Sequence, residues 1–192
     1  MGREFELKYA ANEAVQTALA AAFGPFETIE MATTYYDTPD GALSARRMTL
    51  RRRMENELSV CTVKTPAQDG SRGEWEVPCD RILDAVEKLC KLGAPEELAA
   101  LTADGVVEVC GARFTRRAAA IYLPECTLEL ALDAGVLLGG GKEEALCEVE
   151  LELKSGSETA AVAYAQGLAK KYGLRPESRS KFRRALALAK GE

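Results

Sequence analysis

Hydrophobic and polar residues alternate along much of the chain, which is the period of a β-strand with two different faces. A few intervening segments carry apolar residues at every third or fourth position, which is the period of a helix. The alternation predicts strands over residues 4–9, 28–38, 48–54, 58–65, 73–78, 106–123 (in one or two pieces), 126–133 and 145–154. The helical spacing predicts helices over residues 12–23, 80–92, 96–102, 157–172 and 178–189.

Turn and capping residues separate these segments. Asn12, Asp80 and Ser157 stand where a side-chain oxygen can cap a helix N-terminus. The run 39–41 (Pro-Asp-Gly) predicts a turn, and the glycine cluster at 139–141 predicts a hairpin loop. We find no repeat or Pro-rich linker, so the sequence predicts a single α+β domain over residues 1–192.

The polar faces of the predicted strands are unusual because they carry carboxylates, arginine and lysine in place of the threonine, serine and glutamine common on solvated faces. Every second residue of a strand shares a side. The charged faces contain, in chain order, Glu4, Glu6 and Lys8; Arg51 and Arg53; Lys64; Glu74 and Glu76; Arg113 and Arg117; Glu129 and Asp133; and Glu148, Glu150 and Glu152. One interpretation is a half-buried antiparallel sheet with a solvated face. The other is a barrel whose charged faces line a central tunnel, with the apolar faces outside beneath helices.

The charged side chains of such a tunnel indicate which ligands it would bind. Carboxylates held close together repel and raise one another's pKa values unless cations lie between them. Clustered carboxylate oxygens suit Mg²⁺ or Mn²⁺, and arginine and lysine suit phosphate oxygens. The charge pattern therefore favours a linear polyphosphate bound together with divalent cations.

Composition excludes several other chemistries. Of the 192 residues, 47% are hydrophobic and 29% charged, which is typical of a folded domain. The chain has no histidine, which excludes a Ser-His-Asp triad and a zinc site containing histidine. The six cysteines never form a CxxC pair, and the net charge of −5 does not favour nucleic-acid binding. With no secretory signal or membrane-length apolar run, we expect a cytoplasmic protein that binds neither nucleic acid nor membrane.

Several short motifs occur in an order that resembles the CYTH proteins, also called triphosphate tunnel metalloenzymes. The motifs are EFELK at 4–8, YYDTP at 35–39, LRRR at 50–53, Lys64, EWE at 74–76, Arg117, LDAG at 132–135, EVELE at 148–152 and Ser-Lys at 180–181. The stretches 130–135 and 147–153 are most similar to the bacterial inorganic triphosphatase branch. The resemblance implies an α+β fold built on a closed eight-stranded antiparallel β-barrel, with a charged interior and helices packed outside. It also implies hydrolysis of inorganic triphosphate to diphosphate and phosphate.

The resemblance further implies a role for each charged position. Carboxylates that would bind Mg²⁺ or Mn²⁺, with two ions per site, are Glu4, Glu6, Glu74, Glu76, Asp133, Glu148 and Glu150. Cations that would bind the triphosphate are Lys8, Arg51, Arg53, Lys64, Arg117 and Lys181. Lys8, Lys64 and Tyr35 are the candidate catalytic residues, because a tyrosine and lysine at the positions of Tyr35 and Lys64 are thought to help activate water. Residues with a weaker case are Arg113, Glu129, Glu152, Arg179 and Arg183.

Family resemblance leaves other functions open. A class IV adenylyl cyclase would use ATP, and a thiamine or nucleoside triphosphatase would accept a larger organic tail on the same scaffold. A non-catalytic module would bind polyphosphate without turnover. The partner in each case is a triphosphate-bearing small molecule, and an edge strand or exposed helix could also form a homodimer.

Overall fold

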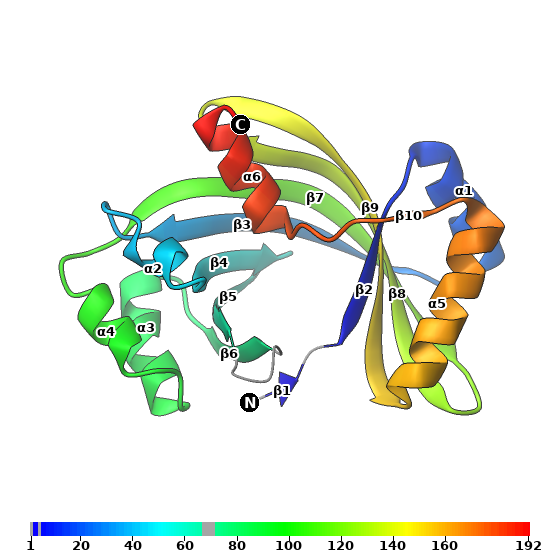
Figure 1. The fold of residues 1–192 in the computed structure, drawn as a ribbon, viewed down its shortest axis with the longest axis horizontal. Coiled ribbons are helices and arrows are strands. Elements are labelled where there is room, and N and C mark those ends of the chain that lie inside the picture. The colour runs from blue at the N-terminus through cyan, green and yellow to red at the C-terminus, as the bar shows by residue number, and fades with distance from the viewer. Residues whose placement is uncertain (1, 4, 67–71) are drawn as a thin grey trace.

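The computed structural model describes residues 2–3, 5–66 and 72–192, which form one curved sheet with six helices (Figure 1). The strands are β1 (Gly2–Arg3), β2 (Glu6–Ala10), β3 (Glu27–Asp37), β4 (Thr49–Glu55), β5 (Leu58–Pro66), β6 (Arg72–Pro78), β7 (Val107–Tyr122), β8 (Cys126–Gly139), β9 (Lys142–Gly156) and β10 (Arg175–Pro176). The helices are α1 (Glu13–Ala22), α2 (Ala42–Ala45), α3 (Ile82–Lys91), α4 (Glu97–Leu101), α5 (Glu158–Tyr172) and α6 (Lys181–Lys190). None of the helices within the described residues has the length and apolar character needed to cross a membrane.

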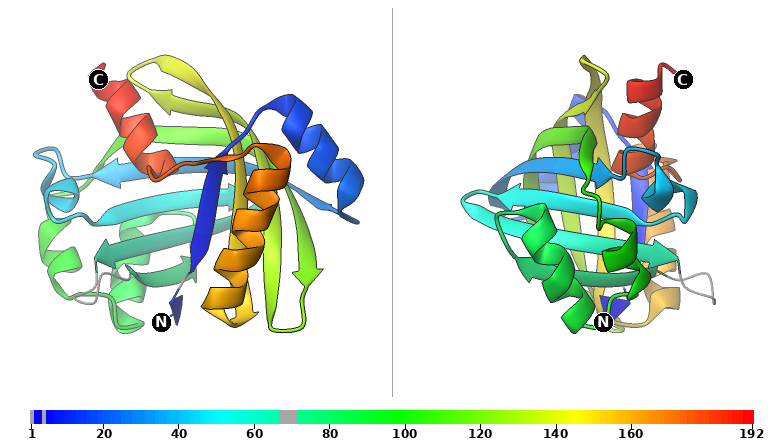
Figure 2. Two further views of the ribbon diagram at one scale, coloured as in Figure 1. Left: turned by 45° about the vertical axis from the view of Figure 1, so that its right-hand side comes forward. Right: turned by 90° about the vertical axis from the view of Figure 1, so that its left-hand side faces the viewer.

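The sheet is antiparallel throughout and runs in the order β1-β6-β5-β4-β3-β7-β8-β9-β2-β10. The expected closed eight-stranded barrel is therefore corrected in two respects. The described residues form ten strands, because the two-residue strands β1 and β10 add to the eight longer ones. The sheet is also not closed: its two edge strands are β1 and β10, and no ladder in the described part of the chain joins them. The two views in Figure 2 show the resulting curl.

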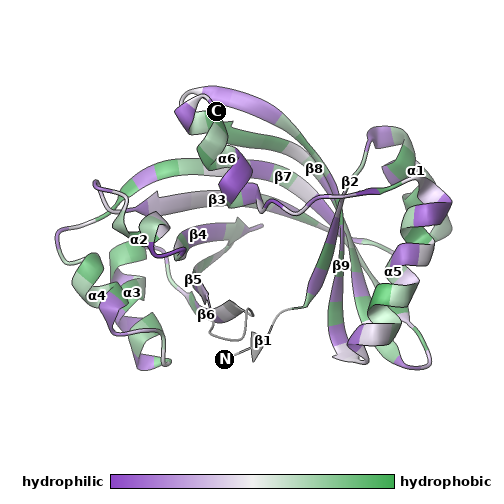
Figure 3. Ribbon diagram, in the orientation of Figure 1, coloured by the Kyte–Doolittle hydropathy of each residue, from purple (hydrophilic) through white to green (hydrophobic). Residues whose placement is uncertain are grey.

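The outer face of the sheet is apolar and covered by helices. Against α1 and α5, strands β7, β8 and β9 bury a cluster that includes Leu130, Leu132 and Val149. Against α3 and α4, strands β4 and β5 bury a second cluster around Leu50 and Val63. Full burial of one such side chain contributes about 1.5–3 kcal/mol. The prediction that apolar strand faces lie outside beneath helices is confirmed for these four helices, and Figure 3 shows green residues in each of them.

Helix α6 differs from the other long helices because it packs on the inner face. Its Ala185 lies in a buried cluster with Met31, Phe114 and Leu137, which belong to the inner side of β3, β7 and β8. The expectation that every helix packs outside is therefore wrong for α6. The physical reason is that this part of the inner face is apolar, so the helix can bury an apolar stripe there.

Local structure follows the predicted signals at most positions. The side chains of Asn12 and Ser157 cap α1 and α5 by accepting hydrogen bonds from Val15 N at 2.9 Å and Ala160 N at 3.2 Å. Asp80 does not cap α3, because the residue at that N-cap is Arg81. The glycine cluster does form a hairpin loop, although β8 and β9 extend to Gly139 and Lys142, beyond the predicted ends.

Candidate functional site

The register of the sheet aligns the charged side chains into rows on its inner face. Lys8 on β2 lies opposite Glu150 on β9, and Glu6 lies opposite Glu152. Across the sheet, Arg51 on β4 lies opposite Tyr35 on β3. Because direct neighbours in an antiparallel ladder project to the same side, the predicted carboxylates and cations of these strands share one face. The structure therefore places the charged faces of these strands on the inner side of the sheet.

Three carboxylates meet at the centre of this face and are called the acidic cluster: Asp133, Glu148 and Glu150. Asp133 and Glu148 are neighbours across β8 and β9, and Glu150 follows two positions along the same side of β9. Each offers an oxygen within 4.8 Å of the others, and no other group of this kind occurs among the described residues. Asp133 and Glu148 are 0% exposed and Glu150 is 6% exposed. Such burial is costly without counter-charges.

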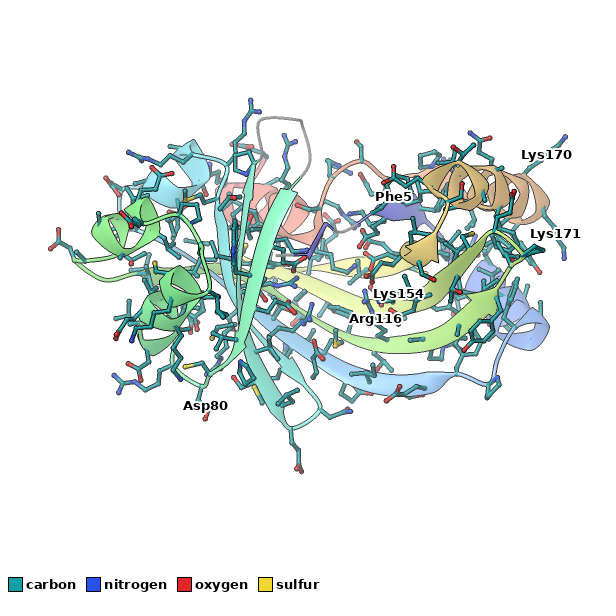
Figure 4. All side chains as sticks on the ribbon, turned by 90° about the horizontal axis from the view of Figure 1, so that it is seen from below. Phe5, Asp80, Arg116, Lys154, Lys170 and Lys171 are labelled. Atoms are coloured by element: carbon teal, nitrogen blue, oxygen red, sulfur yellow. The ribbon has the colours of Figure 1, made fainter. Side chains whose placement is uncertain are left out.

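Three cations supply that counter-charge. Lys181 Nζ lies 2.8 Å from Asp133 Oδ2, 2.7 Å from Glu148 Oε2 and 2.6 Å from Glu150 Oε1. Arg116 donates to both oxygens of Asp133 at 2.8 and 2.7 Å and also contacts Glu150. Arg184 Nη1 donates to Glu148 Oε1 at 2.6 Å. Figure 4 shows Arg116 toward the middle of the molecule, whereas Lys170 and Lys171 project outward from the end of α5.

These contacts keep Glu150 and Lys181 charged despite their burial. Burial disfavours the ionised form of Glu150, but the attraction of Lys181 and Arg116 is larger and lowers its pKa. Burial likewise disfavours the charged form of Lys181, but Glu150, Asp133 and Glu148 raise its pKa. The Glu150 carboxylate and the Lys181 ammonium are therefore both ionised at neutral pH.

A second set of ion pairs lines strands β4, β5 and β6. Arg51 Nη2 lies 3.5 Å from Glu74 and 3.6 Å from Glu76, and Arg53 Nη2 lies 3.7 Å from Glu76. Lys64 Nζ lies 3.2 Å from Glu74. The structure therefore places the two predicted β6 carboxylates among arginine and lysine, outside the acidic cluster.

Tyr35 connects the two sets. Its ring centroid lies 5.1 Å from that of Phe182 in α6, and both Arg51 and Lys181 act on its hydroxyl electrostatically. Desolvation by burial nevertheless dominates and raises the pKa of Tyr35. The hydroxyl is therefore neutral at neutral pH and can donate or accept a hydrogen bond, but it does not supply a phenolate base.

The weaker candidates lie away from the acidic cluster. Lys154 Nζ bridges Glu129 at 3.5 Å and Glu152 at 2.8 Å near one end of the inner face. Arg179 pairs with Glu177 at 3.1 Å and is 59% exposed. Arg183 is exposed on α6. Glu4 lies outside the described residues.

Strand β7 requires a correction. Arg116, and not Arg117, contacts the acidic cluster, because Arg116 is the direct neighbour of Asp133 in the ladder. Arg113 and Arg117 alternate with it and therefore project to the opposite face. Arg113 pairs there with Glu143 at 3.0 Å. Arg116 and Arg117 are adjacent in the sequence, so only the register of β7 against β8 decides which of them faces the acidic cluster.

Two further residues were missed by sequence reasoning. Arg184 lies one helical turn after Lys181, a spacing that could have indicated a shared face of α6. Gln16 is a buried polar residue of α1, 3% exposed, and its Nε2 donates to the backbone oxygens of Asp133 at 2.8 Å and Glu148 at 2.9 Å. It therefore holds β8 and β9 together from the outer face, directly behind two carboxylates of the acidic cluster.

The acidic cluster fits a divalent cation by its donor chemistry. Its three hard oxygen ligands converge within 4.8 Å, and Mg²⁺ and Mn²⁺ prefer carboxylate oxygens. Glu6 lies on the neighbouring strand and acts electrostatically on Arg116, which places it at the margin of the cluster. Asp133, Glu148 and Glu150 are thus the residues that the structure offers to a metal ion.

Comparison with known sequences finds one protein family. A family model for the CYTH domain matches residues 2–186. The inorganic triphosphatase of Haemophilus influenzae is 29% identical over 167 residues, which cover 82% of this chain and 47% of that protein. The chain therefore spans about half the length of the curated relative that it matches.

Comparison with solved structures shows the same fold at low identity. HpAC1 from Hippeastrum, described as a candidate adenylyl cyclase with a dominant triphosphatase activity, superimposes with a TM-score of 0.63 and 19% identity, covering 98% of this chain and 96% of that one. A candidate adenylate cyclase from Bacillus halodurans gives a TM-score of 0.61 and 17% identity, covering 96% and 98%. PH1819 from Pyrococcus horikoshii gives 0.61 and 23%, covering 97% and 99%. These similarities establish the fold alone.

Proposed function

Because the chain belongs to the CYTH domain family, we propose that it hydrolyses inorganic triphosphate to diphosphate and phosphate, with Mg²⁺ or Mn²⁺ as cofactor. The observation that carries the proposal is the inner face itself, where a buried acidic cluster lies on the same surface as a row of arginine and lysine side chains. Such a surface matches a small, highly charged anion bound together with a divalent cation. The similarity to an inorganic triphosphatase supports this choice of substrate.

In this proposal the carboxylates bind the metal ion and the arginine and lysine side chains bind the phosphate. Asp133, Glu148 and Glu150 would hold the metal ion, which would offset phosphate charge and acidify water when bound. The phosphate oxygens would be bound by five cations of the inner face: Lys8, Arg51, Arg53, Lys64 and Arg116. Phosphoryl transfer depends mainly on positioning and electrostatic stabilisation, so no protein nucleophile is needed.

Tyr35 and Lys64 have narrower roles in this proposal. Tyr35 is neutral and buried beside Arg51, so it orients a water or phosphate oxygen by hydrogen bonding. Lys64 already neutralises Glu74 and would exchange this partner for a phosphate oxygen. A cytoplasmic location and the homodimer stay predictions, as does the second metal ion.

Replacing one carboxylate tests the proposed metal site. Glu148→Gln keeps the size of the side chain but removes its charge, so phosphate release from triphosphate should fall at least about a hundredfold. Glu87→Gln, on the exposed surface of α3, is the matched control and should retain activity. Near-normal release by the Glu148 variant would contradict the metal assignment.

Product analysis tests the substrate. Phosphate release should be measured with triphosphate, diphosphate, ATP and thiamine triphosphate, each with and without Mg²⁺ or Mn²⁺. We expect metal-dependent release from triphosphate and little from the others. Cyclic AMP from ATP would identify a cyclase instead, and faster release from thiamine triphosphate would identify an organic triphosphatase. Tight triphosphate binding without turnover would indicate a polyphosphate-binding module.

A further inference from the structure

Lys181 occupies the point where the acidic cluster converges. Its Nζ lies 2.6–2.8 Å from an oxygen of each of the three carboxylates, and its side chain is 11% exposed. The sequence motif suggested that this lysine binds phosphate, but in the structure its partners are the residues that would bind the metal. One ammonium group and one metal ion cannot both fill the centre of the same three carboxylates.

The charges of the cluster are balanced by the protein alone. Asp133, Glu148 and Glu150 carry three negative charges, and their contacts Lys181, Arg116 and Arg184 carry three positive charges. Arg184 also pairs with the half-exposed Glu144 at 3.0 Å, so even with this carboxylate counted a bound divalent cation leaves positive charge in excess. A divalent cation added to this balanced set would leave an excess of positive charge in a buried place, which is unfavourable. Departure of the Lys181 ammonium removes one of those positive charges and frees the oxygens.

We propose that Lys181 is an internal counter-ion that competes with the divalent cation for the acidic cluster, so that metal binding transfers this ammonium from the carboxylates to the triphosphate. The inference rests on the proposed function, because it takes the acidic cluster as the metal site. It gives Lys181 two successive partners and couples the binding of metal to the binding of substrate.

The position of Lys181 in the fold allows this exchange. It is the first residue of α6, directly after the Ser180 N-cap, so its long side chain can turn without unwinding the helix. Beyond it, Phe182 packs against Tyr35, and Ala185 is buried against the inner face. The helix is therefore anchored past its first residue, and the ammonium moves while most of α6 stays in place.

The exchange predicts that metal and triphosphate promote each other's binding. Triphosphate offers Lys181 a new anionic partner and so lowers the cost of leaving the carboxylates. A ligand that removes such a cost for a second ligand must strengthen its binding, and the effect is reciprocal.

Calorimetric titration with Mn²⁺ alone tests the inference. Lys181→Met removes the competing ammonium, so the variant should bind Mn²⁺ at least about tenfold more tightly than the wild type. Lys190→Met, in the exposed last turn of the same helix, is the matched control and should bind Mn²⁺ like the wild type. Equal or weaker Mn²⁺ binding by the Lys181 variant would overturn the inference.

A second measurement uses the wild type and does not depend on folding of the variant. The side-chain nitrogen resonance of Lys181, followed by NMR during titration with diamagnetic Mg²⁺, should shift as the metal binds, because the ammonium leaves its carboxylate partners. Saturable Mg²⁺ binding with an unchanged Lys181 resonance would overturn the inference.

The two proposals fail in different ways. If the wild type releases phosphate from triphosphate while removal of Lys181 leaves Mn²⁺ affinity unchanged, only the inference fails. If the wild type neither binds Mn²⁺ nor releases phosphate, the proposed function itself fails.

Discussion

At the scale of single residues, the orientation of β7 decides which arginine serves the site. Arg116 and Arg117 are adjacent, and strand alternation requires that only one of them faces inward. The ladder pairs Arg116 with Asp133, and its guanidinium contacts both Asp133 and Glu150. Arg117 faces the outer side, where its charge acts on the pKa of the Cys147 thiol.

Replacing each of these two arginines separately should therefore have unequal effects on stability and on phosphate release. Arg116→Met removes one partner from each of two buried carboxylates, which keep Lys181. It should therefore destabilise the fold by about 1.5–3 kcal/mol and reduce phosphate release at least about tenfold. Arg117→Met should keep phosphate release within about twofold of the wild type. Urea unfolding and a phosphate-release assay measure the two effects. Greater loss of activity in the Arg117 variant would show that the assignment of β7 is wrong.

At the scale of secondary-structure elements, the position of α6 on the inner face depends on its close contact with the β8–β9 hairpin. A Cβ added to Gly139 would overlap the backbone oxygen of Ala185 and lie 2.6 Å from the nitrogen of Ala189. The absence of a side chain at Gly139 thus lets the helix backbone approach the hairpin. This approach places the first turn of α6 over the acidic cluster.

Two glycine substitutions with opposite expected effects on the free energy of unfolding test this packing. Gly139→Ala should force α6 away from the hairpin and reduce the free energy of unfolding by about 1–3 kcal/mol. Gly167→Ala, at an exposed position of α5 where an added Cβ meets no atom within 4 Å, should increase it by up to about 1 kcal/mol. Urea unfolding measures both. A Gly139 variant as stable as the wild type would show that α6 does not need this contact.

At the scale of the whole molecule, the fold places apolar surface outside under four helices and charge inside. This arrangement is stable only while the buried charges remain paired, which links stability to pH. Burial opposes ionisation of Glu150, but Lys181 and Arg116 outweigh it and hold the pKa of this carboxyl below its ordinary value of 4.5. Glu76 has a lowered pKa as well, because Arg53, Thr62 and Arg51 outweigh its desolvation.

Stability should therefore fall in acid. A carboxyl whose pKa is lower in the folded than in the unfolded protein stabilises the fold above about pH 4.5, and this contribution is lost as the pH falls toward the folded pKa. We expect the melting temperature to decrease steadily below about pH 4.5. Glu150→Gln should flatten this decrease, whereas Glu57→Gln, in the exposed turn between β4 and β5, is the control. An unchanged slope in the Glu150 variant would contradict the ion-pair account.

The sequence by itself determined the features that depend on neighbouring residues. Alternation revealed that Glu148 and Glu150 share a face, and local caps such as Asn12 located helix ends, because both signals arise within a few residues. Tertiary structure alone decided that β7 turns Arg116 inward, that α6 enters the inner face, and that the sheet stays open. It also brought Lys181 to Asp133 and Glu148, since strand register and helix docking depend on contacts between distant segments, which local periodicity does not encode.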